Sequence, residues 1–140
     1  MKVVIELAGP PVGKGRPRFF RKTGHAYTPE PTRTYETNLK YAAQVAMAGR
    51  PPMEGPLAVV VVATLPIAES WSKKRKAAAR DGVERPTKTP DWENIAKMLD
   101  AFNEVVWRDD AQVVEGRITK LYGERPALHV TVEQIEQRVL

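Results

Sequence analysis

The sequence contains no cysteine, and its only histidines are His25 and His129. The lack of cysteine excludes disulfides, zinc–thiolate sites and cysteine nucleophiles, and it makes a reducing cytosol the expected compartment. With two histidines, a multi-histidine metal site within one chain is not expected. Long apolar runs are also missing, since no segment approaches the roughly 18 apolar residues of a membrane span. The N-terminus lacks the apolar core of a signal peptide. We therefore expect a cytoplasmic protein that is not inserted in a membrane.

The residues that are present point to one globular domain with an uneven distribution of charge. A chain of 140 residues, 42% of them hydrophobic, is long enough to bury a core, so we expect a single domain over residues 1–140. Between Thr89 and Glu115, seven acids and two bases give a formal charge of −5, whereas the whole chain carries +5. An acidic segment within a basic protein is expected when the acids hold a divalent cation and the surroundings bind a polyanion.

Two basic clusters lie outside the acidic segment, and neither contains an acid. One occupies residues 14–22 and the other residues 73–80. Clusters of this kind bind DNA phosphates, although a solvated surface is the ordinary alternative for each of them. The candidate DNA-binding residues are Lys14, Arg16, Arg18, Lys73, Lys74, Arg75 and Lys76.

The hydrophobic patterns predict alternating strands and helices. Strands are expected at 2–8, 57–65, 112–120 and 127–135, a hairpin at 18–28, and helices at 33–48, at 70–80 and from residue 92. The buried side of the helix at 33–48 should contain Tyr35, Leu39, Ala42, Val45 and Ala46. The strand at 57–65 is a nearly continuous β-branched run, which predicts a central strand covered on both faces.

The acidic segment has the spacing of a helix with one apolar and one charged side. With Asp91 as N-cap, the charged side carries Glu93, Lys97, Asp100 and Glu104. A helix that ends near residue 103 is roughly 18 Å long, and the chain to residue 110 can return by roughly 23 Å. We therefore expect an early helix end and an extended return through residues 105–107, which would place Asp110 beside Asp91 and Glu93.

Carboxylates gathered in this way suit the hydrolysis of phosphodiesters. Mg²⁺ prefers hard oxygen ligands and retains several waters, so a few carboxylates and a substrate phosphate are sufficient ligands. The ion polarises the phosphate and generates hydroxide, and a nearby lysine such as Lys97 can hold a phosphate oxygen.

Each of these residues also has an ordinary structural explanation. Asp91 is a common type of N-cap, and Glu93 in the first turn complements the helix dipole. Glu93 and Lys97 form a routine i, i+4 pair. The Asp109–Asp110 pair is typical of a turn. Spacing alone therefore leaves the structural and the functional interpretations both open.

The segment nevertheless resembles the RusA family of Holliday-junction resolvases. The resemblance rests on PDWEN at 90–94, Lys97, DAFN at 100–103, VW at 106–107 and DDAQVVE at 109–115. The family pattern is close to P-D-x-D-N-x-x-K-x-x-x-D-A-L-N-G, a W, then D-D-x-Q-[IV]. Weaker similarity continues upstream in GKGRPRF, AYTPEPTRTYE and SWSKKRKAA. Together these stretches cover most of the chain.

The resemblance implies an α+β fold, which we expect to be a single small domain with a mixed sheet of about four to five strands and two to three helices. It also implies a homodimeric, Mg²⁺- or Mn²⁺-dependent endonuclease that nicks four-way DNA junctions in paired cuts, in a bacterial or phage-infected cell. No small-molecule cofactor is expected. Position by position, the implied catalytic residues are Asp91, Glu93, Lys97 and Asp110, and the implied metal ligands are Asp91, Glu93, Asp109 and Asp110. Asp100 matches a recurrent family aspartate of unassigned role.

Two positions depart from the family pattern. Glu93 stands where the family usually has Asp, which moves the carboxylate by about 1.5 Å at a metal that tolerates little misplacement. Glu104 replaces the usual Gly after Asn103, and glycine is the preferred residue for ending a helix.

Three functions are therefore weighed. The leading one is a metal-dependent junction nuclease. The first alternative is a branched-DNA-binding module that does not cut, and the second is a protein-interaction domain whose acids bind a structural cation. Salt-dependent DNA affinity separates the first two from the third, and Mg²⁺-dependent nicking separates the nuclease from the binding module.

Overall fold

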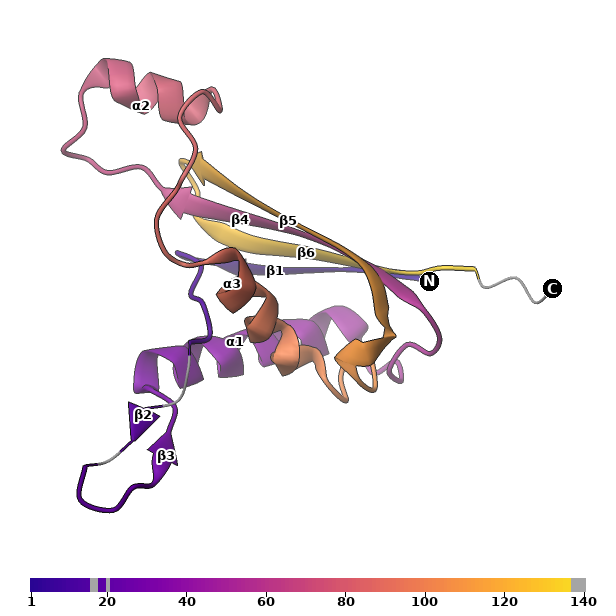
Figure 1. The fold of residues 1–140 in the computed structure, drawn as a ribbon. Helices are drawn as coiled ribbons and strands as arrows, with labels where there is room; N and C mark the ends of the chain where they lie inside the picture. The colour runs from indigo at the N-terminus through magenta and orange to yellow at the C-terminus, as the bar shows by residue number, and fades with distance from the viewer. Residues whose placement is uncertain (16–17, 20, 137–140) are drawn as a thin grey trace.

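A computed structural model describes residues 1–15, 18–19 and 21–136. Its centre is a four-stranded mixed sheet in the order β1-β6-β4-β5 (Figure 1). The strands are β1 (Lys2–Ala8), β4 (Leu57–Pro66), β5 (Val113–Gly123) and β6 (Ala127–Gln134). β6 is antiparallel to both of its neighbours, whereas β4 and β5 are parallel. β5 therefore lies at one edge of the sheet, beside β4.

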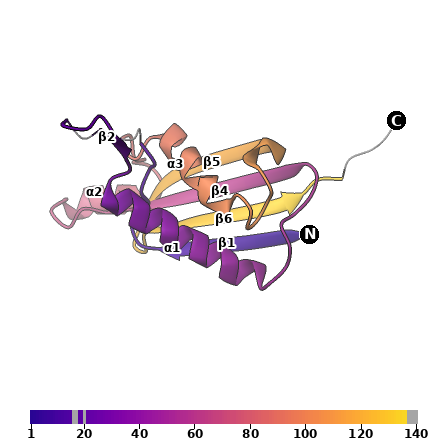
Figure 2. The same ribbon diagram turned by 90° about the horizontal axis from the view of Figure 1, so that it is seen from below.

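Two helices cover one face of this sheet, as Figure 2 shows. They are α1 (Glu30–Met47) and α3 (Trp92–Met98), and α3 continues as the 3-10 helix η1 (Leu99–Phe102). The buried residues of α1 are Tyr35, Leu39, Ala43 and Met47, which recur every four residues along one side. The expectation for Val45 was wrong, since its side chain is 61% exposed. Val45 lies about 80° from Tyr35 around the helix, at the margin of the buried side.

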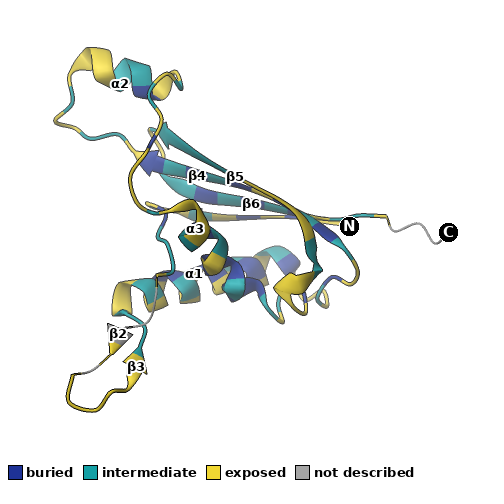
Figure 3. Cartoon of the chain, viewed as in Figure 1, coloured by how far each residue is buried: buried dark blue, intermediate teal, exposed yellow. Residues whose placement is uncertain are grey.

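The opposite face of the sheet is partly open to solvent. Along β4, Leu57, Val59 and Val61 are buried, whereas Val60 between them is 44% exposed. Figure 3 shows this alternation of buried and less buried positions. The prediction that this strand is covered on both faces was therefore wrong. The run contains a single polar residue, Thr64, near its end, so its periodicity could not reveal the less buried face.

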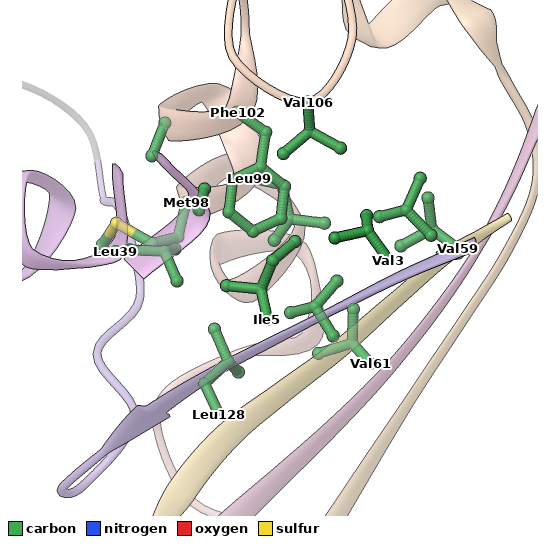
Figure 4. Close-up of a cluster of buried hydrophobic side chains, with 14 of the residues drawn as sticks. Val3, Ile5, Leu39, Val59, Val61, Met98, Leu99, Phe102, Val106 and Leu128 are labelled. Carbon is green, nitrogen blue, oxygen red and sulfur yellow. The ribbon is translucent and has the colours of Figure 1, made fainter. Parts of the chain in front are cut away.

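The core lies between the sheet and the two helices (Figure 4). Val3 and Ile5 from β1 and Val130 and Val132 from β6 face the same side, because each pair is two residues apart. Phe102 and Trp107 are fully buried and meet edge to face, with ring centroids 5.4 Å apart. These features confirm the predicted α+β class with a mixed sheet of four strands and three helices.

Two parts of the chain project from this core in Figure 1. One contains α2 (Lys73–Arg80), whose N-cap is Ser72, and the other is the short hairpin of β2 (Arg18–Phe19) and β3 (Ala26–Tyr27). Ser72 accepts a hydrogen bond from the backbone N–H of Arg75, which is the usual contact of a serine N-cap. Within the described residues, no helix is long and apolar enough to cross a membrane.

Candidate active site

The acidic segment ends its helix where the sequence predicted. The backbone leaves the helical conformation at Asn103, which is extended, and Glu104 follows with φ of 65°. This left-handed conformation costs an L residue roughly 1–2 kcal/mol, and glycine adopts it without that cost. Glu104 therefore carries strain at the position where the family pattern has Gly.

The chain after Asn103 closes into a tight turn instead of running back extended. The backbone N–H of Glu104 donates to the carbonyl of Trp107, and the Trp107 indole N–H donates to Asn103 Oδ1 over 2.7 Å. Val106 and Met53 are joined by a further backbone hydrogen bond of 2.7 Å. The expected extended return through residues 105–107 was therefore wrong, because the buried Trp107 ring holds the turn against Phe102.

Gln112 fixes the backbone of the Asp109–Asp110 pair. Its side-chain oxygen accepts hydrogen bonds from the N–H groups of Arg108 and Asp109, at 2.8 and 3.1 Å. Its amide nitrogen donates to the carbonyls of Met53 and Gly55. Asp109 caps the 3-10 helix η2 (Asp110–Gln112) by accepting from the N–H of Ala111. This role of Gln112 was not predicted, although a Gln three residues after an acidic N-cap is the sequence signal of a capping box.

Three carboxyl groups lie in one region beside η2, although they are not close enough to hold a metal ion together. Asp110 is near Asp109, its neighbour in the chain, and near Asp100, which comes from η1. The hydrogen bond with Asp109 raises the pKa of Asp110, and partial burial and the nearby negative charge of Asp100 act in the same direction. The same hydrogen bond lowers the pKa of Asp109. Asp100, whose role the sequence left open, is thus a close neighbour of Asp110.

The first turn of α3 holds the other predicted acids. Asp91 is the N-cap residue, yet its exposed side chain makes no capping hydrogen bond. The Glu93 carboxylate pairs with Lys97 at 3.2 Å, as the i, i+4 spacing predicted. The ordinary capping explanation therefore does not account for the side chain of Asp91.

The acids of one chain do not form a finished metal cage. Across residues 1–15, 18–19 and 21–136, no group of three or more Asp, Glu or His side chains is close enough to hold a metal ion. The expected convergence of Asp91, Glu93 and Asp110 is thus not found within a single chain. The tight turn after Asn103 uses the residues that were expected to run back, so Asp110 meets Asp100 instead. The catalytic and metal-binding roles of these residues remain predictions.

The first basic cluster reaches the acidic segment through Lys14. The Lys14 ammonium lies 3.1 Å from Glu36 Oε1 on α1 and 3.6 Å from Asp100 Oδ2. The preceding residue, Gly13, lies against the start of α3, where a Cβ atom would come within 2.8 Å of Asn94 Cβ. Arg16 lies outside the described residues, as does the side chain of Arg18. Their predicted contacts with DNA are untested, and Lys14, the candidate DNA-binding residue whose side chain is described here, faces carboxylates.

The second basic cluster is divided between structural and exposed residues. The Arg75 guanidinium lies 3.6 Å from the centre of the Trp71 ring and makes a bidentate pair with Glu84. Arg80 pairs with Glu124. Lys73 and Lys74 are exposed, and Lys76 is half-buried. Arg75 thus has local partners, whereas the three lysines make no ion pair with any residue in the described part of the chain.

An apolar cavity of about 340 Å³ connects the start of α3 with Asp110. Its lining includes Trp92, Ala96, Val61, Ile118 and Asp110. Trp92 follows Asp91 directly and is 57% exposed. Of the predicted acids, Asp110 lines this hollow, whereas Asp91 and Glu93 are the chain neighbours of a lining residue, Trp92.

Comparison with known proteins assigns the chain to a family. The family model described as endodeoxyribonuclease RusA matches residues 8–133. A Bacillus subtilis (strain 168) protein, the uncharacterized protein YqaN, is 36% identical over 138 residues, which cover 95% of this chain and 96% of that protein. The family match runs from the last residue of β1 to the next-to-last residue of β6 and includes every predicted site residue. The chain therefore belongs to the RusA family of endodeoxyribonucleases.

Proposed function

We propose that this protein is a metal-dependent endonuclease that resolves four-way DNA junctions by hydrolysing one phosphodiester bond in each of two opposed strands. The proposal rests on family membership and on one structural observation, the contact of Asp110 with Asp109 and Asp100. Carboxylates crowded together repel one another, and a divalent cation relieves that repulsion. The described acids of one chain are not close enough to hold an ion by themselves, so the proposed Mg²⁺ or Mn²⁺ needs further carboxylates from a second copy.

The donor set proposed for this cation is Asp109 and Asp110, together with Asp91 and Glu93. All four are carboxylates, which is the ligand chemistry that Mg²⁺ and Mn²⁺ take. The bound ion would supply charge neutralisation at the scissile phosphate and a more acidic water. Lys97 pairs with Glu93 in the free protein and would donate to a phosphate oxygen of the bound substrate. Gln112 keeps the Asp109 backbone fixed, so the carboxylates meet the substrate already oriented.

A homodimer accounts for the separation of the two acidic groups. The apolar hollow between Trp92 and Asp110 is open on one side, and the exposed indole of Trp92 is the kind of residue that dimer interfaces bury. In a two-fold arrangement, a second copy seated on this surface brings its own acids to the hollow. We infer that Asp91 and Glu93 of one copy act with Asp110 of the other. Two such sites would also match the two-fold symmetry of a four-way junction.

Complementation between two inactive variants tests the shared site. Asp91→Asn and Asp110→Asn proteins are each expected to lose junction nicking. When they are mixed and allowed to exchange subunits, the mixed dimer contains one site with both aspartates intact, so nicking should reappear in one strand. If each site lay within one chain, every site in the mixture would lack one acid, and the mixture would stay inactive.

Junction cleavage tests the activity itself. Wild-type protein should nick a synthetic four-way junction when Mg²⁺ is present and should leave it intact in EDTA. Asp91→Asn protein should bind the same junction and fail to cut it, because loss of a negative charge does not weaken phosphate contacts. Equal cutting by the two proteins would remove Asp91 from the site.

The alternative is a branched-DNA-binding module that does not cut. Glu93 is the feature that favours it, because its longer side chain is already paired with Lys97 and stands where the family usually has Asp. The Glu93→Asp variant separates the two functions. A nuclease should keep or gain Mg²⁺-dependent cutting, whereas a binding module should remain inactive in both forms.

The projecting α2 segment is the proposed DNA contact away from the acids. Lys73, Lys74 and Lys76 make no ion pair with described residues, and they lie on one short helix. Changing all three to Ala should weaken junction binding and reduce the slope of log affinity against log salt by up to about three. The Lys2→Ala variant, on the far edge strand, serves as the control.

A further inference from the structure

Lys14 is paired with carboxylates, unlike an unpaired surface lysine that is available to DNA phosphates. Its ammonium lies between Glu36 Oε1, at 3.1 Å, and Asp100 Oδ2, at 3.6 Å, and only 26% of its side chain is exposed. Glu36 comes from α1 and Asp100 from η1. One side chain from the loop after β1 thus joins two further elements, and one of its two partners, Asp100, belongs to the acidic segment.

The backbone around Lys14 is fixed against α3. The N–H of Lys14 donates to the carbonyl of Asn94 over 2.8 Å. Gly13 lies so close to Asn94 and Pro90 that a Cβ atom at this position would lie 2.8 and 3.0 Å from their Cβ atoms. The base of the Lys14 side chain is therefore positioned by the same helix that begins at Asp91.

Asp100 connects Lys14 with the acids of η2. It pairs with Lys14, and its charge is near Asp110, since η1 and η2 are in contact. Glu36 and Asp100 also line a groove of about 290 Å³ between α1 and η1, so the pair faces a hollow that solvent ions can enter. A positive charge in this place must affect any second cation that binds beside Asp110.

We propose that Lys14 is a positioning residue that acts as the built-in counter-ion of the acidic cluster. It holds Asp100 in place while no divalent cation is bound, and it opposes the entry of that cation through charge repulsion. This inference rests on the proposed function, because the cation is the one assigned there to Asp109 and Asp110. It gives the Gly-Lys-Gly loop a role in setting metal affinity, which differs from the phosphate contact that its sequence predicts.

Metal binding without DNA provides the discriminating measurement. The full-length protein is titrated with Mn²⁺ by calorimetry as wild type, Lys14→Met, Lys14→Arg and the control Lys2→Met. Lys14→Met removes the charge and keeps the length of the side chain, so it should bind Mn²⁺ roughly three- to tenfold more tightly, by the size of a Coulomb term between partly exposed charges. Lys14→Arg and Lys2→Met should bind like wild type.

Thermal melting in EDTA measures the holding role separately. Lys14→Met should lower Tm by roughly 2–5 °C, since Glu36 and Asp100 lose their cation. The same change made in a Glu36→Gln, Asp100→Asn background should lower Tm by much less, because few partners remain to be lost. Saturating Mn²⁺ should reduce the deficit of Lys14→Met, since the variant binds the ion more tightly.

The outcomes separate this inference from the proposed function. Equal or weaker Mn²⁺ affinity of Lys14→Met, with normal binding by wild type, overturns the counter-ion role and leaves the nuclease intact. If that variant instead loses junction affinity and one unit of salt slope, Lys14 is a phosphate contact. A wild-type protein that binds no Mn²⁺, with or without a junction, defeats both proposals.

Discussion

The core and the α2 segment are stabilised by different kinds of contact. Between the sheet and its helices, the side chains are apolar and buried, and Phe102, Leu39 and Val61 have no exposed surface. In the α2 segment, the contacts are made by half-exposed groups around Trp71, which meets Arg75 on one side and the Tyr122 ring, 5.2 Å away, on the other. Only Ala79 of α2 is buried.

This difference indicates which region can move. Burial of apolar surface depends little on salt, whereas exposed ion pairs are screened by it. A segment held by few buried contacts opens with a lower free energy than the domain as a whole. We expect α2 to open locally at little cost while the sheet and the acidic cluster keep their positions. Such a division suits a protein that must admit a branched duplex to a fixed site.

The largest loss of stability should come from truncating a large buried side chain in the core. Phe102→Ala removes a ring that is fully buried against Trp107, and it should lower the free energy of unfolding by about 3–5 kcal/mol. Equilibrium urea denaturation followed by tryptophan fluorescence measures this. The matched change Val45→Ala, at an exposed position of α1, should cost less than about 0.5 kcal/mol. Similar losses for the two variants would contradict the assigned core.

A smaller and more local effect is expected from Trp71→Ala in the α2 segment. The variant loses both the ring contact with Tyr122 and the guanidinium contact of Arg75, which together should be worth about 1–2 kcal/mol. Hydrogen exchange should show faster exchange of the α2 amides, with the β4 and β6 amides unchanged. If all amides lost protection equally, the segment would be part of the cooperative core.

Glu104 offers a gain of stability at the turn beside the acids. Glu104→Gly relieves a left-handed residue at φ of 65° and should raise the free energy of unfolding by about 0.5–1 kcal/mol. Glu104→Ala keeps the strain and also loses the exposed pair with Arg108, so it should give no gain. Thermal melting of the two variants compares them, and a gain from alanine equal to that from glycine would exclude backbone strain as the cause.

The smallest effect is expected for the exposed pair of Arg80 and Glu124. Arg80→Ala should change the free energy of unfolding by at most about 0.5 kcal/mol, because exposed ion pairs are weak. Melting at low and high salt provides the check, and the small difference from wild type should vanish at high salt. A loss above 1 kcal/mol would place this pair among the core contacts.

The sequence predicted the positions of helices and strands better than it predicted which of their faces are buried. Periodicity located α1 and β4, because those signals depend on local residue types. The helix end at Asn103 was predicted from the length of chain needed to return to Asp110, and it was confirmed although that return was not. It could not show that one face of β4 is open, since valines on both faces leave no alternation to detect. Val45 was misplaced for a related reason, as an apolar residue can lie at the margin of a buried side.

The sequence identified the residues of the candidate site, but it did not predict how they are arranged. The motif singled out Asp109 and Asp110, and the structure places them at the N-terminus of one short helix, with Asp109 as its N-cap. The contact between Asp100 and Asp110 depends on the turn that Trp107 and Asn103 close, and no spacing rule reveals a tertiary hydrogen bond of that kind. The pairing of Lys14 with Glu36 joins residues 22 positions apart, so a charge pattern along the chain could not predict it.

Gly13 has a consequence for how sequences of this family vary. Its backbone does not have a positive φ, so glycine is needed here for clearance and not for conformational freedom. A larger residue could be accommodated only if Asn94 became smaller or the loop moved off the helix. Substitutions at positions 13 and 94 should therefore occur together during evolution, and a sequence with a side chain at 13 and an unchanged 94 should carry its lysine in a different place.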